Sequence, residues 1–179
     1  MKLLRTIRLD ASDTFIFDTA AEPGEWAVSG AFVFWNTDPA MLEGKARSAF
    51  RGGLLGVASL GWSTLAQIVE ASEEERRAAI DTLARQLMAR FGAPGMTDAV
   101  AAAQEEFAFA ASLCEHPLDT LVAVHRSAEG DRIHEAFRTL RPRSGAKPAR
   151  AFSFLDVEGE DDEPGDAVDL ISMAGRDRQ

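Results

Sequence analysis

The sequence predicts a single α+β domain in which a mainly antiparallel sheet forms one layer and two long helices pack on one face. Two observations lead to this class. Short segments typical of strands follow one another directly through short turns, and this succession favours antiparallel pairing. Two longer segments with apolar residues at helical spacing, about 72–91 and 97–115, come one after the other instead of alternating with strands.

The strand predictions cover five segments in the first half of the chain. Each is bounded by turn residues and carries apolar side chains on one or both faces. The segments are 1–9, 14–18, 26–35, 54–58 and 62–70. Segment 26–35 is apolar on both faces, so we expect it to be a central strand. A short helix should follow it, beginning after Asp38 with Pro39 at its first position and ending at Gly52 and Gly53.

The first long helix has signals at both ends. Ser72 can cap it, Glu75 three residues later can complete a capping box, and Gly92 followed by Pro94 can end it. One stripe is apolar and is expected to face the core; it comprises Ile80, Leu83, Ala84, Leu87, Met88 and Phe91. This helix therefore requires a sheet or another helix to cover the stripe.

The second long helix ends before Pro117 and leads into a hairpin. Its inward stripe is expected to comprise Val100, Ala103, Phe107, Ala110, Ala111 and Cys114, whereas Glu105 and Glu106 are expected on a solvated face. Segments 120–126 and 132–140 then predict two paired strands around residues 127–131.

The 179 residues suffice for one well-buried core, which we assign to residues 1–155. The formal net charge is −10, and residues 156–179 hold nine acidic and two basic residues, or −7, which leaves −3 for residues 1–155. Residues 156–179 are therefore predicted to be an acidic C-terminal tail. Within it, residues 167–173 form a small amphipathic patch that could dock on the same chain or on another.

Composition also excludes several classes of function. A nearly balanced body without a concentrated basic face argues against binding to nucleic acid. No apolar run approaches the roughly 18–20 residues of a membrane span, and no signal peptide is evident. The lone Cys114 fits a reducing compartment, so the expected location is cytoplasmic.

The sharpest candidate for chemistry is a cluster of metal-ligand residue types between positions 114 and 134. It comprises Cys114, His116, His125 and His134. A tight turn at Glu129–Gly130 would place His125 opposite His134, and imidazole with thiolate suits zinc or another transition metal. The alternative is structural: Cys114 packs as a small hydrophobe, His116 meets the last carbonyls of a helix, and a register change separates the other two.

Aromatic residues are frequent in the first half of the chain, among them Trp26, Trp35 and Trp62. Their spacing favours core packing. The functional alternative is an apolar pocket or a protein interface, where aromatic residues are enriched.

Three stretches carry a resemblance to a known family. They are MKLLRTIRLD with the following Ser12 and Asp13, GEWAVSGAF at 24–32, and FRGGLLG at 50–56. They resemble a family of small bacterial proteins described only as a domain of unknown function. The resemblance covers about residues 1–140, leaves the acidic tail outside, and implies no activity, cofactor or functional residue.

These observations favour a non-catalytic cytoplasmic domain that binds another protein, as an accessory or assembly factor, and that self-associates into a homo-oligomer. In the tail, the expected partner-binding residues are Val168, Leu170, Ile171 and Met173. The alternative is a small-molecule or metal-binding domain, including a metal-dependent enzyme that uses the cluster at 114–134. No cofactor is expected under the first hypothesis.

Overall fold

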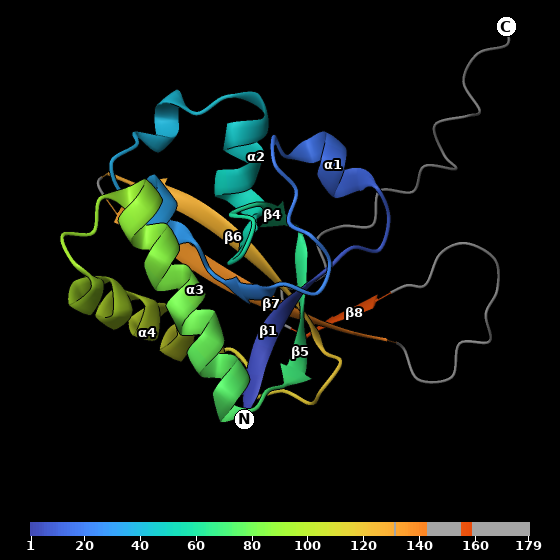
Figure 1. Ribbon diagram of the computed structural model, residues 1–179. Coiled ribbons are helices and arrows are strands. Elements are labelled where there is room, and N and C mark those ends of the chain that lie inside the picture. The colour runs from blue at the N-terminus through green and yellow to red at the C-terminus, as the bar shows by residue number, and fades with distance from the viewer. Residues whose placement is uncertain (131, 143–154, 159–179) are drawn as a thin grey trace, which may run out of the picture.

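The computed structural model of the protein describes residues 1–130, 132–142 and 155–158 (Figure 1). Its strands form one antiparallel sheet in the order β4-β3-β2-β1-β5-β6-β7-β8. The strands are β1 (Lys2–Ile7), β2 (Trp26–Val28), β3 (Leu54–Gly56), β4 (Trp62–Ser63), β5 (Leu65–Glu70), β6 (Leu121–Glu129), β7 (Arg132–Pro142) and β8 (Leu155–Glu158). The helices are α1 (Ser12–Ile16), α2 (Gly44–Gly52), α3 (Glu73–Phe91) and α4 (Met96–Ser112), with 3₁₀ turns η1 (Ala31–Phe34) and η2 (Pro39–Met41). The predicted α+β class and the antiparallel pairing are confirmed.

The two long helices lie side by side in Figure 1 and pack on each other, and α4 also contacts β1 and β2. The capping box of α3 forms as predicted: Glu75 N–H donates to Ser72 Oγ at 3.1 Å, and Ser72 N–H donates to Glu75 Oε2 at 2.9 Å. At the other end Gly92 adopts a φ of 71°, in the left-handed region that glycine tolerates without strain. Both ends of this helix are therefore determined locally.

The sheet curls strongly. β1 and β5 separate β2 from β6 in the strand order, yet the guanidinium of Arg126 on β6 hydrogen-bonds to the carbonyl of Ser29, which follows β2 directly. A flat sheet would hold these strands about three inter-strand spacings apart, or roughly 14 Å. Curling thus creates an interior between the β2–β3 end and the β6–β7 hairpin.

The main core fills the space between the sheet and the long helices. Its completely buried members include Leu3, Leu4, Ile68, Leu83, Ala103 and Phe107. A second cluster, formed by Phe17, Phe34, Ala49 and Phe50, lies beside α2. Phe34 stacks on Trp62 with ring centroids 5.3 Å apart and meets Phe50 edge-on at 5.2 Å. The prediction that the aromatic residues of the first half pack in the core is correct for Phe34 and wrong for Phe15, which is exposed.

The prediction of a strand at 14–18 is wrong: residues 14–16 belong to helix α1 (Ser12–Ile16), and Phe17 and Asp18 follow it. The reason lies in Asp13, whose buried carboxylate accepts hydrogen bonds from Ser63 Oγ at 3.3 Å and from the backbone and hydroxyl of Thr64. These bonds hold the segment in a turn and interrupt the predicted strand 62–70 at Thr64, which separates β4 from β5.

Segment 26–35 was expected to be one long strand, but only Trp26–Val28 pairs in the sheet. Gly30 ends the strand with a φ of 79°, and a Cβ at this position would lie 2.6 Å from Leu55 Cβ. Close backbone approach and a left-handed conformation both require glycine here. The chain continues as η1, which turns Phe34 inward and Trp35 outward.

The short helix predicted after Asp38 is divided. Asp38 caps η2 by accepting a hydrogen bond from Ala40 N–H at 2.9 Å, but Leu42 and Glu43 are extended and α2 begins only at Gly44. At the other end of the chain, β8 pairs with β7 through Arg141↔Asp156 and Thr139↔Glu158. The first three residues assigned to the acidic tail are thus part of the sheet.

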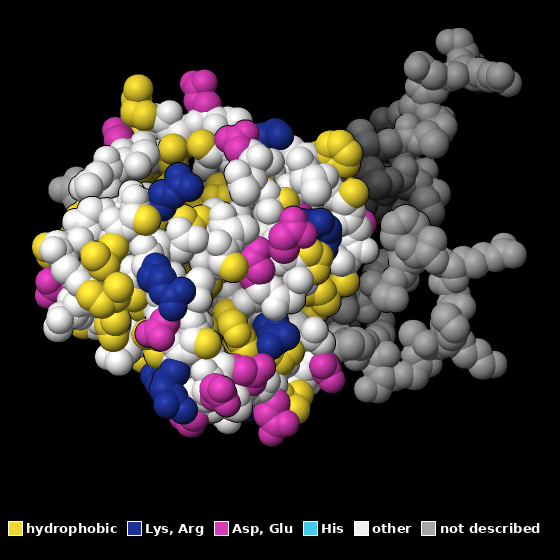
Figure 2. All heavy atoms as spheres, in the orientation of Figure 1, with side chains coloured by type: hydrophobic (Ala, Val, Ile, Leu, Met, Phe, Trp, Pro, Cys, Tyr) yellow, Lys and Arg dark blue, Asp and Glu magenta, His cyan; other side chains and the backbone are white. Residues whose placement is uncertain are grey.

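The surface drawn in Figure 2 mixes acidic, basic and hydrophobic side chains, and hydrophobic ones gather near the loop between α3 and α4. Met88, Phe91 and Met96 are exposed there, so the predicted inward stripe of α3 holds only up to Leu87. None of the helices in the described ranges combines the length and apolar composition needed to cross a membrane.

Candidate functional site

The most exposed large hydrophobic side chain in the described residues is the indole of Trp35, of which 83% is accessible to solvent. It follows η1 directly, where Gly30 has redirected the chain out of the sheet. Trp35 lines three adjacent pockets, so the surface around it is both apolar and hollowed. Exposed tryptophan in a concave setting is typical of binding surfaces.

The first pocket, called here the Glu106 pocket, has a volume of about 510 Å³. Its lining residues are Ala31 and Phe32 of η1, Trp35 directly after η1, Glu106 of α4 and Ile133 of β7. Its walls are apolar and aromatic except for one carboxyl group. The edge of Phe32 also meets Phe91 of α3 at a centroid distance of 5.2 Å, which fixes this wall against the helix pair.

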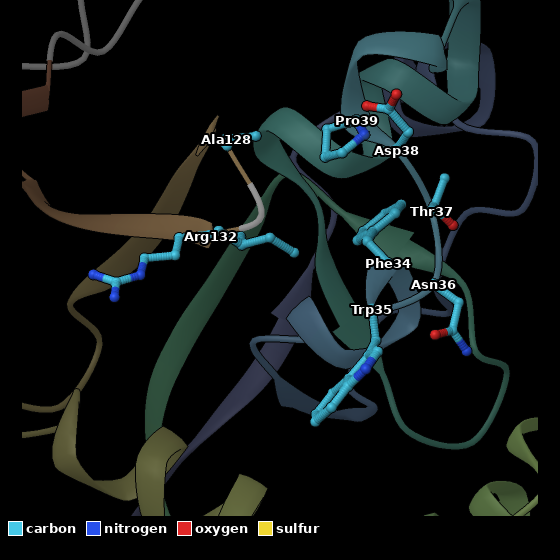
Figure 3. A pocket seen from close by; sticks show the side chains of 10 residues that line it. Phe34, Trp35, Asn36, Thr37, Asp38, Pro39, Ala128 and Arg132 are labelled. Carbon is cyan, nitrogen blue, oxygen red and sulfur yellow. The ribbon is translucent and has the colours of Figure 1, made fainter.

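The second pocket lies between residues 34–39 and the β6–β7 turn and has a volume of about 510 Å³ (Figure 3). In Figure 3 Phe34 lies at the inner side, Trp35 extends away from Asn36, and the guanidinium of Arg132 points away from the pocket. The third pocket, of about 430 Å³, continues from Trp35 across Phe91 to Glu105. All three pockets share Trp35 as a lining residue.

Glu106 has an unusual environment for a helical carboxylate. Its Oε2 is buried and has no hydrogen-bond partner among the described residues. Burial, reinforced by the nearby carboxylate of Glu135, raises the pKa of Glu106 to about 7, against the opposing effects of Arg126 and a hydrogen bond from the backbone of Gly30. Glu106 therefore exchanges its proton in the neutral pH range.

A buried ion-pair network lies behind this pocket, inside the curl of the sheet. Arg126 is 1% exposed, and its Nε donates to Glu135 Oε1 at 2.7 Å. Its Nη1 donates to the carbonyls of Phe50 at 3.1 Å and Gly53 at 2.7 Å, and its Nη2 donates to Ser29. Ser29 Oγ in turn donates to Glu135 Oε1 at 2.5 Å. One guanidinium thus joins Ser29, two residues before η1, to the end of α2 and to the β6–β7 hairpin.

The electrostatics of the network follow from this burial. Desolvation lowers the pKa of Arg126, whereas Glu135 and Glu106 raise it by stabilising the cation. With one cation and two carboxyl groups, the network carries an excess of negative charge whenever Glu106 is ionised. The arrangement suits the recognition of a ligand that brings hydrogen-bond donors or positive charge.

A family comparison covers nearly all of this architecture. The model of a family of unknown function, DUF6505, matches residues 1–153. The chain belongs to the DUF6505 family. The suspected resemblance to a family without known function is thereby confirmed, and all residues of the Glu106 pocket and the ion-pair network lie within the matched range. The chain matches no curated protein and no solved structure.

The metal-ligand candidates are distributed differently in this DUF6505 fold. His125 pairs with Ala136 and His134 pairs with Ser127, so the predicted direct pairing of the two histidines is wrong. The reason is the turn: Gly130, with a φ of 59°, allows β6 and β7 to pair as far as Glu129↔Arg132, which shifts the register by two residues.

The remaining candidates have other contacts. Cys114 is buried and its Sγ donates to the carbonyl of Ala110 at 3.3 Å. His116 Nδ1 lies 3.2 Å from Arg141, and His134 Nε2 lies 3.5 Å from Glu129. Within the described ranges, no three His, Cys, Asp or Glu side chains converge in a way that could hold a metal ion. The four tail residues, Val168, Leu170, Ile171 and Met173, lie outside the described residues.

The sequence does not mark Glu106, Arg126 or Glu135 as site residues, and it indicates Trp35 only as one of several aromatic residues. Glu106 was assigned to a solvated face, whereas one of its oxygens is buried. A usable signal was present in the helical spacing: position 106 lies three residues after Ala103 and four before Ala110, both completely buried. For Trp35, the alternative of a pocket or interface agrees better with its exposure than the core assignment does.

Proposed function

We propose that this DUF6505 chain is a non-catalytic binding module that holds another protein at the surface around Trp35. The observation that carries the proposal is the position of the Trp35 indole, 83% exposed at the junction of three pockets. Removing a tryptophan of this exposure from water is favourable, and tryptophan is the residue type most enriched among interface residues of high energetic weight.

The surroundings have the organisation of an interface. The three pockets combine apolar side chains, those of Phe32, Ile133 and Phe91, with polar ones, those of Asn36, Asp38 and Glu105. A combination of apolar and polar groups is the usual composition of a recognition surface. The buried Arg126 network ties Ser29, two residues before η1, to the hairpin, which favours a surface that is formed before a partner arrives and lowers the ordering entropy that opposes binding.

Site-specific photocrosslinking tests this proposal in the cells from which the chain comes. Benzoylphenylalanine replaces the exposed Asn36 next to Trp35, and a matched control places it at Phe15 of α1, which is 75% exposed and does not line the three pockets. We expect a discrete adduct with another protein from position 36 only, and its loss when Trp35→Ala is added. Equal labelling from both positions, or an adduct that survives Trp35→Ala, would contradict the proposal.

A second candidate function is the binding of a small organic molecule in the same pockets. The unpartnered Oε2 of Glu106 favours it, because apolar pockets with one convergent polar group commonly hold small ligands. Native mass spectrometry of the untagged chain distinguishes the two candidates, since a retained small molecule adds a defined mass that disappears on denaturation.

A further inference from the structure

We infer that the Glu106 pocket receives a cationic side chain of the partner, a lysine ammonium or an arginine guanidinium, between the aromatic walls and the Glu106 carboxylate. This inference deepens the proposed function and rests on it. It assigns the chemistry of the group that enters the pocket, whereas the proposal above concerns only the surface.

The first argument is the chemistry of the lining. Among its five lining residues, four are apolar, one is Glu106, and none is Lys, Arg or His. The neighbouring pocket adds the carboxylate of Glu105. An anionic ligand would therefore meet repulsion on entry, whereas a cation would find a carboxylate as the one charged group among the described lining residues.

One carboxylate oxygen of Glu106 is buried and has no hydrogen-bond partner among the described residues. Burial of this kind costs free energy, and a rotation of the Glu106 side chain toward a donor in the pocket would recover the loss. An ionised carboxylate only accepts hydrogen bonds, and ammonium and guanidinium groups only donate them. Either group can therefore bond to Glu106 without bringing an acceptor atom that the carboxylate would repel. A neutral polar group supplies a weaker bond than a charged one.

Two aromatic side chains line the pocket and favour a cation. The rings of Phe32 and Trp35 flank the pocket, and Trp is the aromatic residue that attracts cations most strongly through its ring face. The aliphatic stem of a lysine or arginine would lie against Ile133 and Ala31, while its charged end reaches the carboxylate. The fold already contains one such pair, since the guanidinium of Arg5 lies 4.1 Å from the ring centroid of Trp26.

The groups that face Glu106 determine how pH acts on this binding. They are Arg126 on β6, Glu135 on β7, Glu105 on α4 itself and the uncharged backbone of Gly30. Because the pKa of Glu106 is raised to about 7 in the free protein, a cation must displace its proton at lower pH. Binding should therefore strengthen about tenfold between pH 6 and pH 8, as the ionised fraction of Glu106 rises.

The test is an NMR titration of the full chain with single-residue probes. The probes are N-acetyl-lysine-N-methylamide and N-acetyl-arginine-N-methylamide, with the norleucine analogue as the uncharged match and the glutamate analogue as the anion. We expect the two cationic probes to shift the NMR signals of the Trp35 indole N–H and the Glu106 carboxyl carbon. Their dissociation constants should be at least about tenfold lower than that of the norleucine analogue. The glutamate analogue should not bind.

Two variants complete the test. Glu106→Gln should abolish the preference for the cationic probes, and the neighbouring Glu105→Gln should retain most of it. Trp35→Ala serves as a second route if Glu106→Gln perturbs the fold, and it should weaken the cationic probes without changing the spectrum of the core. The inference fails if norleucine binds as tightly as lysine, if Glu106→Gln keeps the preference, or if affinity does not change between pH 6 and pH 8.

The two proposals can fail separately. In one case a partner is crosslinked at position 36, the adduct forms equally with Glu106→Gln, and the cationic probes do not bind. That result refutes the cationic pocket but agrees with the proposed binding module. In the other case the cationic probes bind as described but no partner is crosslinked. That result supports a cation-binding pocket and refutes the proposal that its occupant is a protein.

Discussion

Arg126 and Glu135 face each other across the β6–β7 pair, and the Nε of the arginine lies 2.7 Å from Oε1 of the glutamate. The guanidinium is completely buried, and only 16% of the Glu135 side chain is exposed. Because the same guanidinium also donates to carbonyls of Ser29, Phe50 and Gly53, this pair is a junction of four chain segments. Replacing both partners of such a buried pair by apolar residues usually changes the stability of a protein little. Removing only one partner is costly, because the other charge stays buried without a counter-charge.

Arg126→Leu should lower the free energy of unfolding by about 3–5 kcal/mol, because Glu135 and three backbone carbonyls lose their donors. Urea unfolding followed by circular dichroism measures the change. The matched control is Arg138→Leu, an exposed arginine on β7, for which we expect a change within about 0.5 kcal/mol. The double variant Arg126→Leu with Glu135→Leu should recover part of the lost free energy of unfolding. If it recovers none, the loss comes mainly from the unpaired carbonyls of Ser29, Phe50 and Gly53.

Glu106 should make the stability fall as pH rises. Its pKa in the fold is about 7 against an ordinary value of 4.5, so the folded state holds the proton more tightly than the unfolded chain does. This contribution is fully present below about pH 4.5 and is lost as pH rises through about 7. The stability of the native chain relative to Glu106→Gln should therefore decrease between pH 5 and pH 8, by up to about 3 kcal/mol.

Urea unfolding at several pH values measures this difference, and the histidines, which titrate in both proteins, cancel from it. Glu105→Gln serves as the control, and its difference from the native chain should be nearly independent of pH in this range. A difference curve for Glu106→Gln as flat as that of the control would show that the carboxyl is ionised throughout.

Ser72→Ala should remove the capping box of α3 and lower the free energy of unfolding by about 1 kcal/mol. Two hydrogen bonds from Ser72 lower the pKa of Glu75, so the substitution should also return that pKa toward its usual value, which a carboxyl-detected NMR titration follows. Ser48→Ala within α2 is the control, and since alanine favours helix it should be nearly neutral. Unchanged titration of Glu75 would mean that the box does not form in solution.

Gly61→Ala should destabilise the fold by about 1–3 kcal/mol. A Cβ at this position would lie 2.6 Å from backbone atoms of Ala20 and Ala21, where the segment after α1 bridges to Trp62, and backbone cannot rotate away as a side chain can. Thermal unfolding measures the effect. Gly52→Ala is the comparison, because its Cβ would meet only Val124 O at 3.8 Å, and it should leave the melting temperature equal or higher.

Cys114 should resist modification in the native protein. Burial raises the pKa of its thiol to about 11, so the thiolate needed for reaction is scarce at pH 8. We expect labelling by iodoacetamide to be at least about 100-fold slower than in urea, as measured by mass spectrometry. Rapid native labelling, or protection that a chelator removes, would revive Cys114 as a metal ligand.

The sequence allowed prediction of those parts of the fold that are determined by local signals. The capped helix α3, the α4 segment and the β6–β7 hairpin depend on capping residues, periodicity and turn chemistry within a few residues, and all three are present. The failures occurred where distant contacts decide local structure. Asp13 converts an expected strand into α1 by binding Thr64, fifty-one residues away. Gly30 ends β2 because Leu55 leaves no room for a side chain.

The candidate site could not be predicted for the same reason. Glu106 and Arg126 are ordinary charged residues in the sequence, and only the curl of the sheet brings η1, α4 and the hairpin together around them. The histidines stand out by residue type, but the pairing of His125 with His134 depends on the register of the hairpin. A register shift of two residues pairs them with Ala136 and Ser127 instead.

The central position of β1 has a consequence for the order of folding. This strand leaves the ribosome before both of its partners, since it lies between β2, about 20 residues later, and β5, more than 55 residues later. Its hydrogen-bonding edge toward β5 stays open until most of the first half of the chain has been made. Nascent chains halted before residue 65 should therefore present an unpaired, apolar strand edge, and this is the stage at which the protein is most exposed to misassembly and to capture by chaperones.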